Sequence, residues 1–454
     1  MKKVDFLFIY EVRSREIENL ALLAACLEKR HYTVAFLNSW QCLGLKYPSY
    51  EAEVVVISAC YDTGTYQYFT GHAAKFKKVV NLQWEQVLKN GFLQSEEPVS
   101  WDFSGEGLVT RHVCWGEKER ERLENRYGIK EEFLRVCGYL PLDFYRPEFS
   151  NFIIKREPLF KESGLDPHKV TALFISSFAM VGLPKEHTGV CNEALKREII
   201  ENSYDSQREI LEWFRQALKK YPMVQFIYRF HPTEADNPIL GEMAREYPNF
   251  FCISTHAIKH WICACDKIYN WVSTSAAEVY KSGKQAFILR PIPVSYGCDM
   301  PIFEGCSAIT DLESFEKSVE LEGEKTSQPL AENALKGYYE VGETPSYIKV
   351  CDFLCDSHKS CEYHSRQYEK NTQFTRFSSR MYTRFWTSRL NISLVKLAKR
   401  TRLNIGFLNC RREAELPTRQ KDLQEESYRK SRCRVNVASD KEIRELIDRY
   451  KTKI

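Results

Sequence analysis

Two segments in the second half of the chain combine side chains suited to binding a phosphate group. Residues 228–232 read YRFHP and directly follow the apolar stretch VQFI, while residues 271–278 read WVSTSAAE and directly follow KIYN. Arg and His donate charge-assisted hydrogen bonds to phosphate, and small hydroxyls beside the free N–H groups at the start of a helix also bind anions. The predicted phosphate-binding residues are Arg229, His231, Ser273, Thr274 and Ser275.

Glu278 lies one turn inside the helix expected after the Ser-Thr-Ser run, where its carboxylate can reach a ribose hydroxyl. Each segment also has a plain structural explanation, because Arg-x-His-Pro is a short motif and Ser-Thr-Ser can simply cap a helix. Their occurrence at two successive strand ends of one domain favours a functional role for both.

A carboxylate near the start of the chain is the predicted catalytic residue. Glu11 lies just past the first expected strand, and a carboxylate there can take the proton from an attacking acceptor hydroxyl. The alternative is that Glu11 and Glu16 form ion pairs with neighbouring arginines at a helix start. The other candidates for the acceptor side are Arg13, Asp62, Trp84, Glu85 and Glu117.

Short apolar runs that alternate with helical patterns must position these residues. Strands are expected at 4–10, 33–37, 54–58, 79–82 and 136–138 in the first half, and at 171–176, 224–229, 250–254, 267–272 and 285–289 in the second. This alternation predicts an α/β fold with parallel sheets covered on both faces. Ligands bind outside the carboxyl ends of such strands, where both phosphate-binding segments fall.

The chain is long enough for more than one domain. Its 454 residues exceed the roughly 250–300 at which a single core usually splits. Residues 140–158 contain three prolines and interrupt the alternation, so we predict the domain junction there. The predicted domains are 1–145, 160–345 and a helical, basic extension at 346–454.

The pairing of R-x-H-P with S-T-S-A-A-E-x-x-x-x-G-K-Q resembles the nucleotide-sugar half of GT-B glycosyltransferases. In the first half, FIYEVRSREIENL, VVNLQWEQ, CWGEKE and CGYLPLDFYRPEF are similar to a family of bacterial surface carbohydrate biosynthesis proteins. The resemblance covers about residues 1–320. It implies a GT-B-like fold, in which two Rossmann-like domains face a cleft, the first for the acceptor and the second for the donor.

The resemblance also implies roles for individual residues. Arg229 and His231 match the motif that contacts the donor phosphate, residues 273–275 match the hydroxyl motif, and Glu278 matches the downstream acid. The implied activity is transfer from a nucleotide-activated sugar to a glycan or lipid-linked glycan in surface polysaccharide or capsule biosynthesis. HP-containing relatives often use a CMP-linked acidic sugar or CDP-glycerol. Alternatives are a non-hydrolysing nucleotide-sugar 2-epimerase and a non-catalytic, membrane-docked subunit of a polysaccharide assembly complex.

The sequence indicates neither a cofactor nor a metal. It has no G-x-x-x-x-G-K-[ST], no G-x-G-x-x-G and no D-x-D, which favours a metal-independent mechanism. One cluster of cysteine and histidine residues could suggest zinc, but its spacing is not C-x-x-C. Cysteine buried as a small hydrophobic residue on one face of a helix explains the cluster without a metal. Its members are Cys351, Cys355, His358, Cys361 and His364.

The net charge of +4 divides unevenly along the chain. Residues 366–412 carry a net charge of +11, and residues 1–365 carry −9. Aromatic and basic side chains alternate with near-helical spacing around residues 374–389, which predicts a helix that docks on an anionic membrane surface. Packing of this helix on the acidic body and RNA binding are the alternatives. RNA binding has no fold signature, so we expect no nucleic-acid partner.

The expected location is cytoplasmic, with peripheral attachment to the inner face of the plasma membrane. The 16 cysteines are dispersed without a compact disulfide framework, which favours a reducing compartment. The opening residues, MKKVDFLFIYEV, are predicted to form a strand rather than a signal peptide. No run approaches 18 apolar residues, so no spanning helix is expected.

Overall fold

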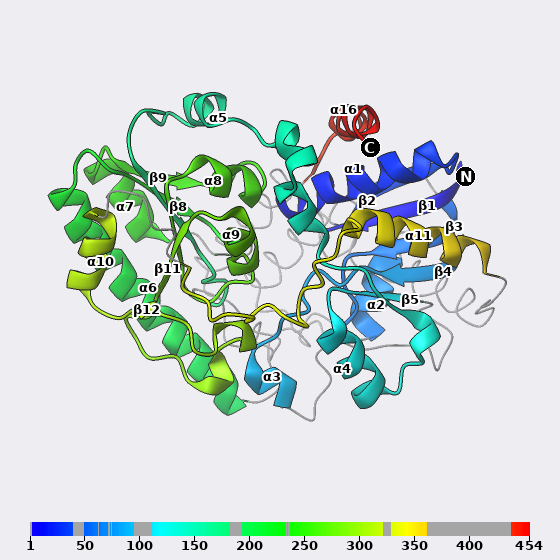
Figure 1. Ribbon diagram of the computed structural model, residues 1–454, viewed down its shortest axis with the longest axis horizontal. Helices are drawn as coiled ribbons and strands as arrows, with labels where there is room; N and C mark the ends of the chain where they lie inside the picture. Colours follow the sequence, from blue (N-terminus) through cyan, green and yellow to red (C-terminus); the bar gives the residue numbers. More distant parts are fainter. Residues whose placement is uncertain are drawn as a thin grey trace, which may run out of the picture.

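The computed structural model describes residues 2–39, 50–61, 63–70, 73, 75–94, 111–181, 193–232, 234, 237–320, 328–360 and 437–454. Two six-stranded parallel sheets organise the chain, one in each half of the sequence (Figure 1). Helices cover the faces of both sheets, and two helices from the C-terminal part lie against the first unit. The predicted α/β class with two parallel sheets and a helical C-terminal region is confirmed.

The first sheet has the strand order β2-β1-β3-β4-β5-β6. Its strands β1 and β3 are almost wholly buried near their carboxyl ends, because helices cover both faces of a parallel sheet. The strands are β1 (Lys2–Tyr10), β2 (Val34–Asn38), β3 (Tyr50–Ile57), β4 (Lys75–Asn81), β5 (Arg111–Cys114) and β6 (Leu134–Val136). The helices are α1 (Arg13–Lys29), α2 (Thr63–Thr70), α3 (Asn90–Gln94) and α4 (Glu117–Tyr127). The sequence did not predict β5, which is only four residues long and includes Arg and His.

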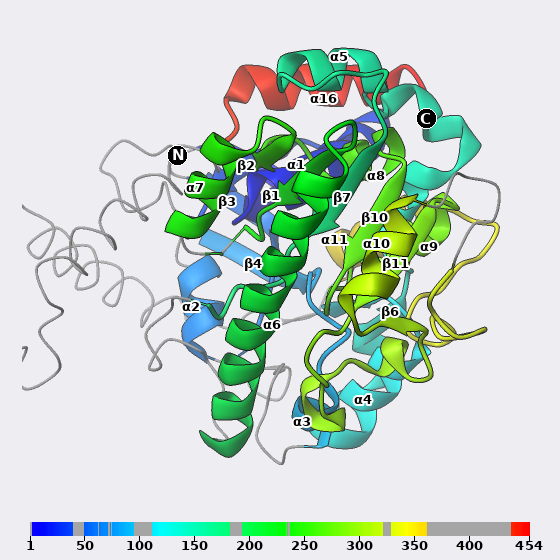
Figure 2. The same cartoon turned by 90° about the vertical axis from the view of Figure 1, so that its left-hand side faces the viewer.

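The second sheet has the order β12-β11-β10-β7-β8-β9. Read from β9 and renumbered within the unit, this is the 3-2-1-4-5-6 order of Rossmann folds. The strands are β7 (Thr171–Ile175), β8 (Gln225–Arg229), β9 (Phe250–Ile253), β10 (Lys267–Asn270), β11 (Gln285–Leu289) and β12 (Ala308–Ile309). The helices are α6 (Glu193–Lys220), α7 (Pro238–Glu246), α8 (Ile258–Ala264), α9 (Ala276–Ser282) and α10 (Leu312–Glu320). The long helix α6 is prominent in Figure 2.

Short 3₁₀ segments at Leu140–Tyr145 and Pro147–Phe152, followed by α5 (Arg156–Glu162), connect the two units. The prolines predicted to mark a domain junction fall in this stretch. The C-terminal helices α11 (Ser346–Lys359) and α16 (Asp440–Lys451) both pack against α1. In Figure 1, α16 lies beside α1, far from the second sheet.

Both described ends of the C-terminal region are attached to the first unit. The Lys78 ammonium on β4 donates to the carbonyl oxygens of Ser357 (2.7 Å) and His358 (3.0 Å) at the end of α11. The N–H of Ala438, just before α16, donates to the Tyr10 hydroxyl at 3.1 Å. The predicted membrane segment, 366–412, lies outside the described residues. Within the described ranges, no helix combines the length and apolar character needed to cross a lipid bilayer.

Candidate active site between the two domains

The strand order places one topological switch point in each sheet. In the first sheet the chain turns to opposite sides after β1, so the carboxyl ends of β1 and β3 flank a crevice. In the second sheet the same relation holds for β7 and β10. Residues 11–16 and 58–61 therefore belong to one crevice, and residues 176–177 and 271–275 belong to the other.

A carboxylate, an arginine and a tyrosine meet at the first switch point. Arg15 Nη1 lies 3.1 Å from Glu85 Oε1, and the Tyr61 hydroxyl donates to Glu85 Oε2 at 2.7 Å. Arg15 Nη2 also pairs with the fully buried Glu16 at 3.2 Å. Glu85 follows β4 and Tyr61 follows β3, so three loops at one sheet edge contribute to this cluster.

Glu16 holds the start of α1 in place. Val12, the residue before the helix, has no side-chain acceptor, and the Glu16 carboxylate instead accepts the N–H groups of Glu11 (3.1 Å) and Val12 (3.0 Å). The Ser58 hydroxyl at the end of β3 donates to the same carboxylate. This arrangement satisfies N–H groups that a helix start leaves free and ties the loop after β1 to β3.

The cluster faces the second domain. The surrounding protein opposes ionisation of Glu85, but Arg15, the Tyr61 hydrogen bond and the charge of His231 together lower its pKa. His231 follows β8 of the second sheet, so the carboxyl ends of both sheets meet here. The Glu85 side chain is 54% exposed.

Glu11, the predicted base, lies close to the same cluster. Burial opposes the charge of Arg15, but Glu16, Glu85 and Glu11 together raise its pKa. Burial is the main cause of the raised pKa of Tyr61, to which Glu85 and then Glu11 also contribute. Glu11 is half-buried. Glu11 and Glu85 therefore both act on Arg15 and Tyr61.

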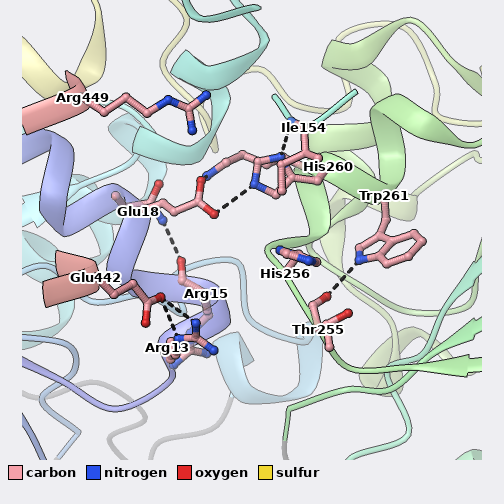
Figure 3. Close-up of polar contacts among 12 residues, drawn as sticks. Arg13, Arg15, Glu18, Ile154, Thr255, His256, His260, Trp261, Glu442 and Arg449 are labelled. Carbon is pink, nitrogen blue, oxygen red and sulfur yellow. Dashed lines mark hydrogen bonds and ion pairs between the residues drawn. The ribbon is translucent and has the colours of Figure 1, made fainter. Parts of the chain in front are cut away.

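The remaining acceptor-side candidates lie elsewhere or outside the described residues. Arg13 pairs with Glu442 of α16 at 2.6 Å (Figure 3), and Glu117 pairs with Arg120 at 2.6 Å at the start of α4. Trp84 is buried in the hydrophobic core, with 6% of its surface exposed. Asp62 lies outside the described residues.

In the second domain, Arg229 and His231 occupy different environments. Arg229 is buried, and its terminal nitrogens donate to the carbonyl oxygens of Thr255 (2.7 Å) and His256 (2.5 Å) in the loop after β9. Burial lowers its pKa to about 10. His231 is only partly buried, and its backbone N–H donates to the Glu234 carboxylate at 2.9 Å. The structure thus brings His231, rather than Arg229, towards the first domain.

The hydroxyl run lies at the second switch point. Ser273 Oγ accepts the N–H of Ser275 at 3.2 Å and lies 2.9 Å from Ser275 Oγ. The N–H of Val272 donates to the Ser177 hydroxyl at 3.4 Å, which connects the carboxyl ends of β10 and β7. Helix α9 starts at Ala276 as expected, but Ser275 makes no side-chain capping bond. The capping explanation therefore does not account for Ser275.

Glu278 faces tyrosines of the interdomain connection. It is 5% exposed and accepts a hydrogen bond from the Tyr145 hydroxyl at 3.1 Å. Burial raises its pKa to about 7, although Lys259 and Tyr145 act in the opposite direction. Tyr139 and Tyr339 also lie within electrostatic reach of this carboxylate. In this structure the carboxylate is covered by protein.

Two further interdomain features were not predicted from the sequence. Lys89, after β4, donates to the carbonyl of Cys298 at 2.7 Å and lies 6.0 Å from the Trp271 ring centroid; burial lowers its pKa to about 8. Glu18 on α1 pairs with Lys259 (2.9 Å) and His260 (3.0 Å) of α8 (Figure 3). Only their position next to the predicted motifs could have indicated them.

The cysteine and histidine residues on α11 have structural partners. Cys351 and Cys355 are buried, and His358 lies 3.0 Å from the Asp5 carboxylate. Cys361 and His364 lie outside the described residues. Among the residues whose placement is described, no group of three or more His, Cys, Asp or Glu side chains could hold a metal ion.

No protein-family model matches this sequence, and no curated protein matches it either. Similar solved structures include the UDP-GlcNAc 2-epimerase of Methanocaldococcus jannaschii in complex with UDP-GlcNAc and UDP, with 15% identity over 78% of this chain and 99% of that one and a TM-score of 0.48. The UDP-GlcNAc 2-epimerase of Neisseria meningitidis shares 13% identity over 78% and 100% of the two chains, with a TM-score of 0.42.

The wall teichoic acid polymerase TagF is also similar, with 10% identity over 84% of this chain and 89% of that one and a TM-score of 0.42. Identities this low concern the fold alone.

Proposed function

We propose that the protein is a metal-independent GT-B glycosyltransferase that uses a nucleotide-activated sugar in bacterial surface polysaccharide biosynthesis. One observation carries the proposal: Glu85, held by Arg15 and Tyr61 at the switch point of the first sheet, lies within electrostatic reach of His231 at a strand end of the second. A carboxylate from one domain and an imidazole donor from the other suit an acceptor hydroxyl and a departing phosphate, respectively.

The donor side would use the second switch point. His231 would donate to the phosphate, and the hydroxyls of Ser273, Thr274 and Ser275 would contact the same group. Arg229 would act chiefly by holding the loop after β9, since its terminal nitrogens contact two carbonyls. Glu278 would contact the ribose once Tyr145 moves aside. Following the family resemblance, we propose a CMP- or CDP-linked donor.

The acceptor side would use a carboxylate of the first domain as base. Glu11 remains the proposed base from the sequence, and Glu85 is its rival. Glu85 has the stronger support because Arg15 and the Tyr61 hydroxyl hold its carboxylate in place, within electrostatic reach of His231. Its side chain is also open to solvent, which an acceptor hydroxyl needs in order to reach it.

A second candidate activity is epimerisation of a nucleotide sugar at C2. It is favoured by the presence of two carboxylates, Glu11 and Glu85, beside one tyrosine, because epimerisation requires proton exchange at the sugar. This reaction needs no acceptor. The two activities therefore separate when a nucleotide sugar is incubated alone, since only an epimerase would convert it to its isomer.

The test of the donor site is His231→Ala, with the exposed His168→Ala as its matched control. We expect His231→Ala to weaken binding of CDP and of the donor by at least about tenfold, the cost of one charge-assisted hydrogen bond, with little change in melting temperature. Calorimetric binding and a panel of nucleotide sugars would measure this. Normal nucleotide binding by folded His231→Ala protein would contradict the proposed donor site.

We further propose that residues 366–412 dock the protein on an anionic membrane, where a lipid-linked glycan acceptor would lie. Supporting this, α11 and α16, which flank the segment, both pack against α1 of the proposed acceptor domain. Each engaged basic residue contributes about 1 kcal/mol near an anionic surface.

Ending the chain at Ser365 would remove the basic segment, but it would also remove α16, which packs against α1. A variant that neutralises arginines and keeps α16 is therefore the better test. The quadruple change Arg376→Gln, Arg380→Gln, Arg384→Gln and Arg389→Gln should abolish co-sedimentation with anionic vesicles at low salt. Neutral vesicles serve as the control. If intact protein stays in the supernatant with anionic vesicles, the segment does not dock on membranes.

A further inference from the structure

The loop that carries His231 is held by a single buried carboxylate. Glu234 is 7% exposed, and its Oε2 accepts the backbone N–H of His231 at 2.9 Å. In the other direction, the N–H of Glu234 donates to the carbonyl of His231, also at 2.9 Å. These two bonds close the turn at Pro232 on both sides, so the backbone of His231 is fixed relative to Glu234.

Glu234 is in turn fixed to three elements of the second domain. Its Oε2 also accepts the Ser176 hydroxyl at the end of β7 (2.6 Å), and its Oε1 accepts the Tyr228 hydroxyl on β8 (2.6 Å) and the Gln207 amide on α6 (3.0 Å). Counting His231, four donors converge on one carboxylate. Burial raises the pKa of Glu234, and the four hydrogen bonds act in the opposite direction by favouring its ionised form.

The network joins the proposed donor site to the switch point. Ser176 directly follows β7, and the neighbouring Ser177 accepts the N–H of Val272, which precedes the hydroxyl run at 273–275. The position of the His231 loop is therefore set relative to the same strand ends that carry Ser273. Neither the sequence resemblance nor the predicted motifs assigned a role to Glu234.

We propose that Glu234 is the positioning residue for His231, and that its carboxylate sets the distance between His231 and the hydroxyls of residues 273–275 for a nucleotide diphosphate. The proposal rests on the proposed donor role of His231. It does not require Glu234 to touch the ligand.

A double-mutant cycle on donor binding tests this proposal. Because Glu234 acts through His231, Glu234→Gln should weaken CDP binding about as much as His231→Ala, and the double variant should bind CDP no more weakly than His231→Ala alone. Tyr228→Phe is the matched control, because it removes a donor to the same carboxylate without touching the His231 link. It should lower the melting temperature and leave the dissociation constant for CDP within about twofold, a change smaller than the loss of one net hydrogen bond, because the His231 N–H, Ser176 and Gln207 still donate to the carboxylate.

The titration of the His231 ring, followed by NMR without ligand, gives a second readout. The midpoint of this titration should shift in Glu234→Gln and stay the same in Tyr228→Phe. Additive losses in the cycle, or a His231 titration that Glu234→Gln leaves unchanged, would overturn the proposal. If His231→Ala itself binds CDP normally, the donor role of His231 fails, and the ring titration still decides whether Glu234 positions it.

Should Glu234→Gln fail to fold, the exchange variant Glu234→Gln/Gln207→Glu keeps one carboxylate and one amide in the network. The amide nitrogen at 234 then faces the carboxylate at 207, which leaves the amide oxygen for the His231 N–H. In Glu234→Gln alone, the donor amide of Gln207 competes with His231 for that single oxygen. We expect this exchange to bind CDP within about threefold of the original protein, a loss smaller than one net hydrogen bond. A folded exchange variant that binds as weakly as His231→Ala would count against the proposal.

Discussion

Two polar clusters face the second domain, and they start one turn apart on α1. Arg15 pairs with Glu85 in front of His231, whereas Glu18 pairs with Lys259 and His260. The Glu85 side chain is 54% exposed, but the Lys259 and His260 side chains are only 4% and 2% exposed. We call the contact at Glu85 the open contact, because its carboxylate is exposed, and the contact at Glu18 the closed contact, because its partners Lys259 and His260 are buried.

In the closed contact, the polar atoms have partners within the protein. His260 Nδ1 accepts the N–H of Ile154 at 3.1 Å while Nε2 donates to Glu18 (Figure 3), which requires a neutral ring. Burial lowers the pKa of His260, in keeping with this state. The Lys259 ammonium lies 3.5 Å from the Phe144 ring centroid. Glu18, Lys259 and His260 therefore join α1 to α8 across the domain boundary. The open contact contains the proposed base, Glu85.

The sharpest test of this division is Glu85→Gln. We expect it to lower the turnover rate by about 10²–10⁴-fold, the usual contribution of a general base, without a change in CDP affinity or melting temperature. Glu117→Gln, an exposed carboxylate paired with Arg120, is the control. Transfer assays on both variants would measure the effect. Full activity of Glu85→Gln would return the role of base to Glu11.

In the closed contact, Glu18→Gln should reduce stability rather than chemistry. Removing one partner of a buried ion pair typically costs about 3–5 kcal/mol, here because Lys259 would keep a buried charge. Urea unfolding would measure it. Glu53→Gln, in the exposed pair with Lys77, should cost less than about 1 kcal/mol. Equal costs at the two sites would mean that the closed contact does not hold the domains together.

Glu278 is buried like the closed contact, but it belongs to the proposed donor site like the residues near the open one. Its variant tests how a buried acid affects stability. Because its pKa is raised from 4.5 to about 7, the folded protein keeps a proton that the unfolded chain loses between these values. The free energy of unfolding should therefore fall as pH rises through this window. Glu278→Gln should remove that fall and gain about 1–3 kcal/mol at pH 8. Unfolding curves at pH 5 and pH 8 for both proteins would show it, and an unchanged difference between the two pH values would contradict it.

The smallest expected effect concerns Tyr61, which donates to Glu85 in the open contact. Tyr61→Phe removes a hydrogen bond that lowers the pKa of Glu85, so the acidic limb of the kcat/KM profile should move to higher pH. The loss of rate at neutral pH should be about tenfold or less, the cost of one net hydrogen bond. Tyr204→Phe, exposed on α6, is the control. An identical pH profile would remove Tyr61 from the site.

Local patterns in the sequence determined the elements and the motifs they carry. Apolar runs identified most strands, and a glycine, Gly128 with φ of 66°, directly follows the last residue of α4. The two motifs were expected at strand ends because the length of a strand and the residues that end it are local properties of the sequence. His231 and Ser273 follow β8 and β10 as predicted.

Only the tertiary structure decided the strand order and the partner of each charged side chain. Arg229 follows the same pattern as His231 but is buried against two carbonyls, and Tyr61 was not singled out at all. The partners of Glu85 lie 24 and 70 residues away, and those of Glu18 lie about 240 residues away. Contacts at such separations depend on how the sheets assemble and on which domain faces which, and neither is encoded in a local repeat.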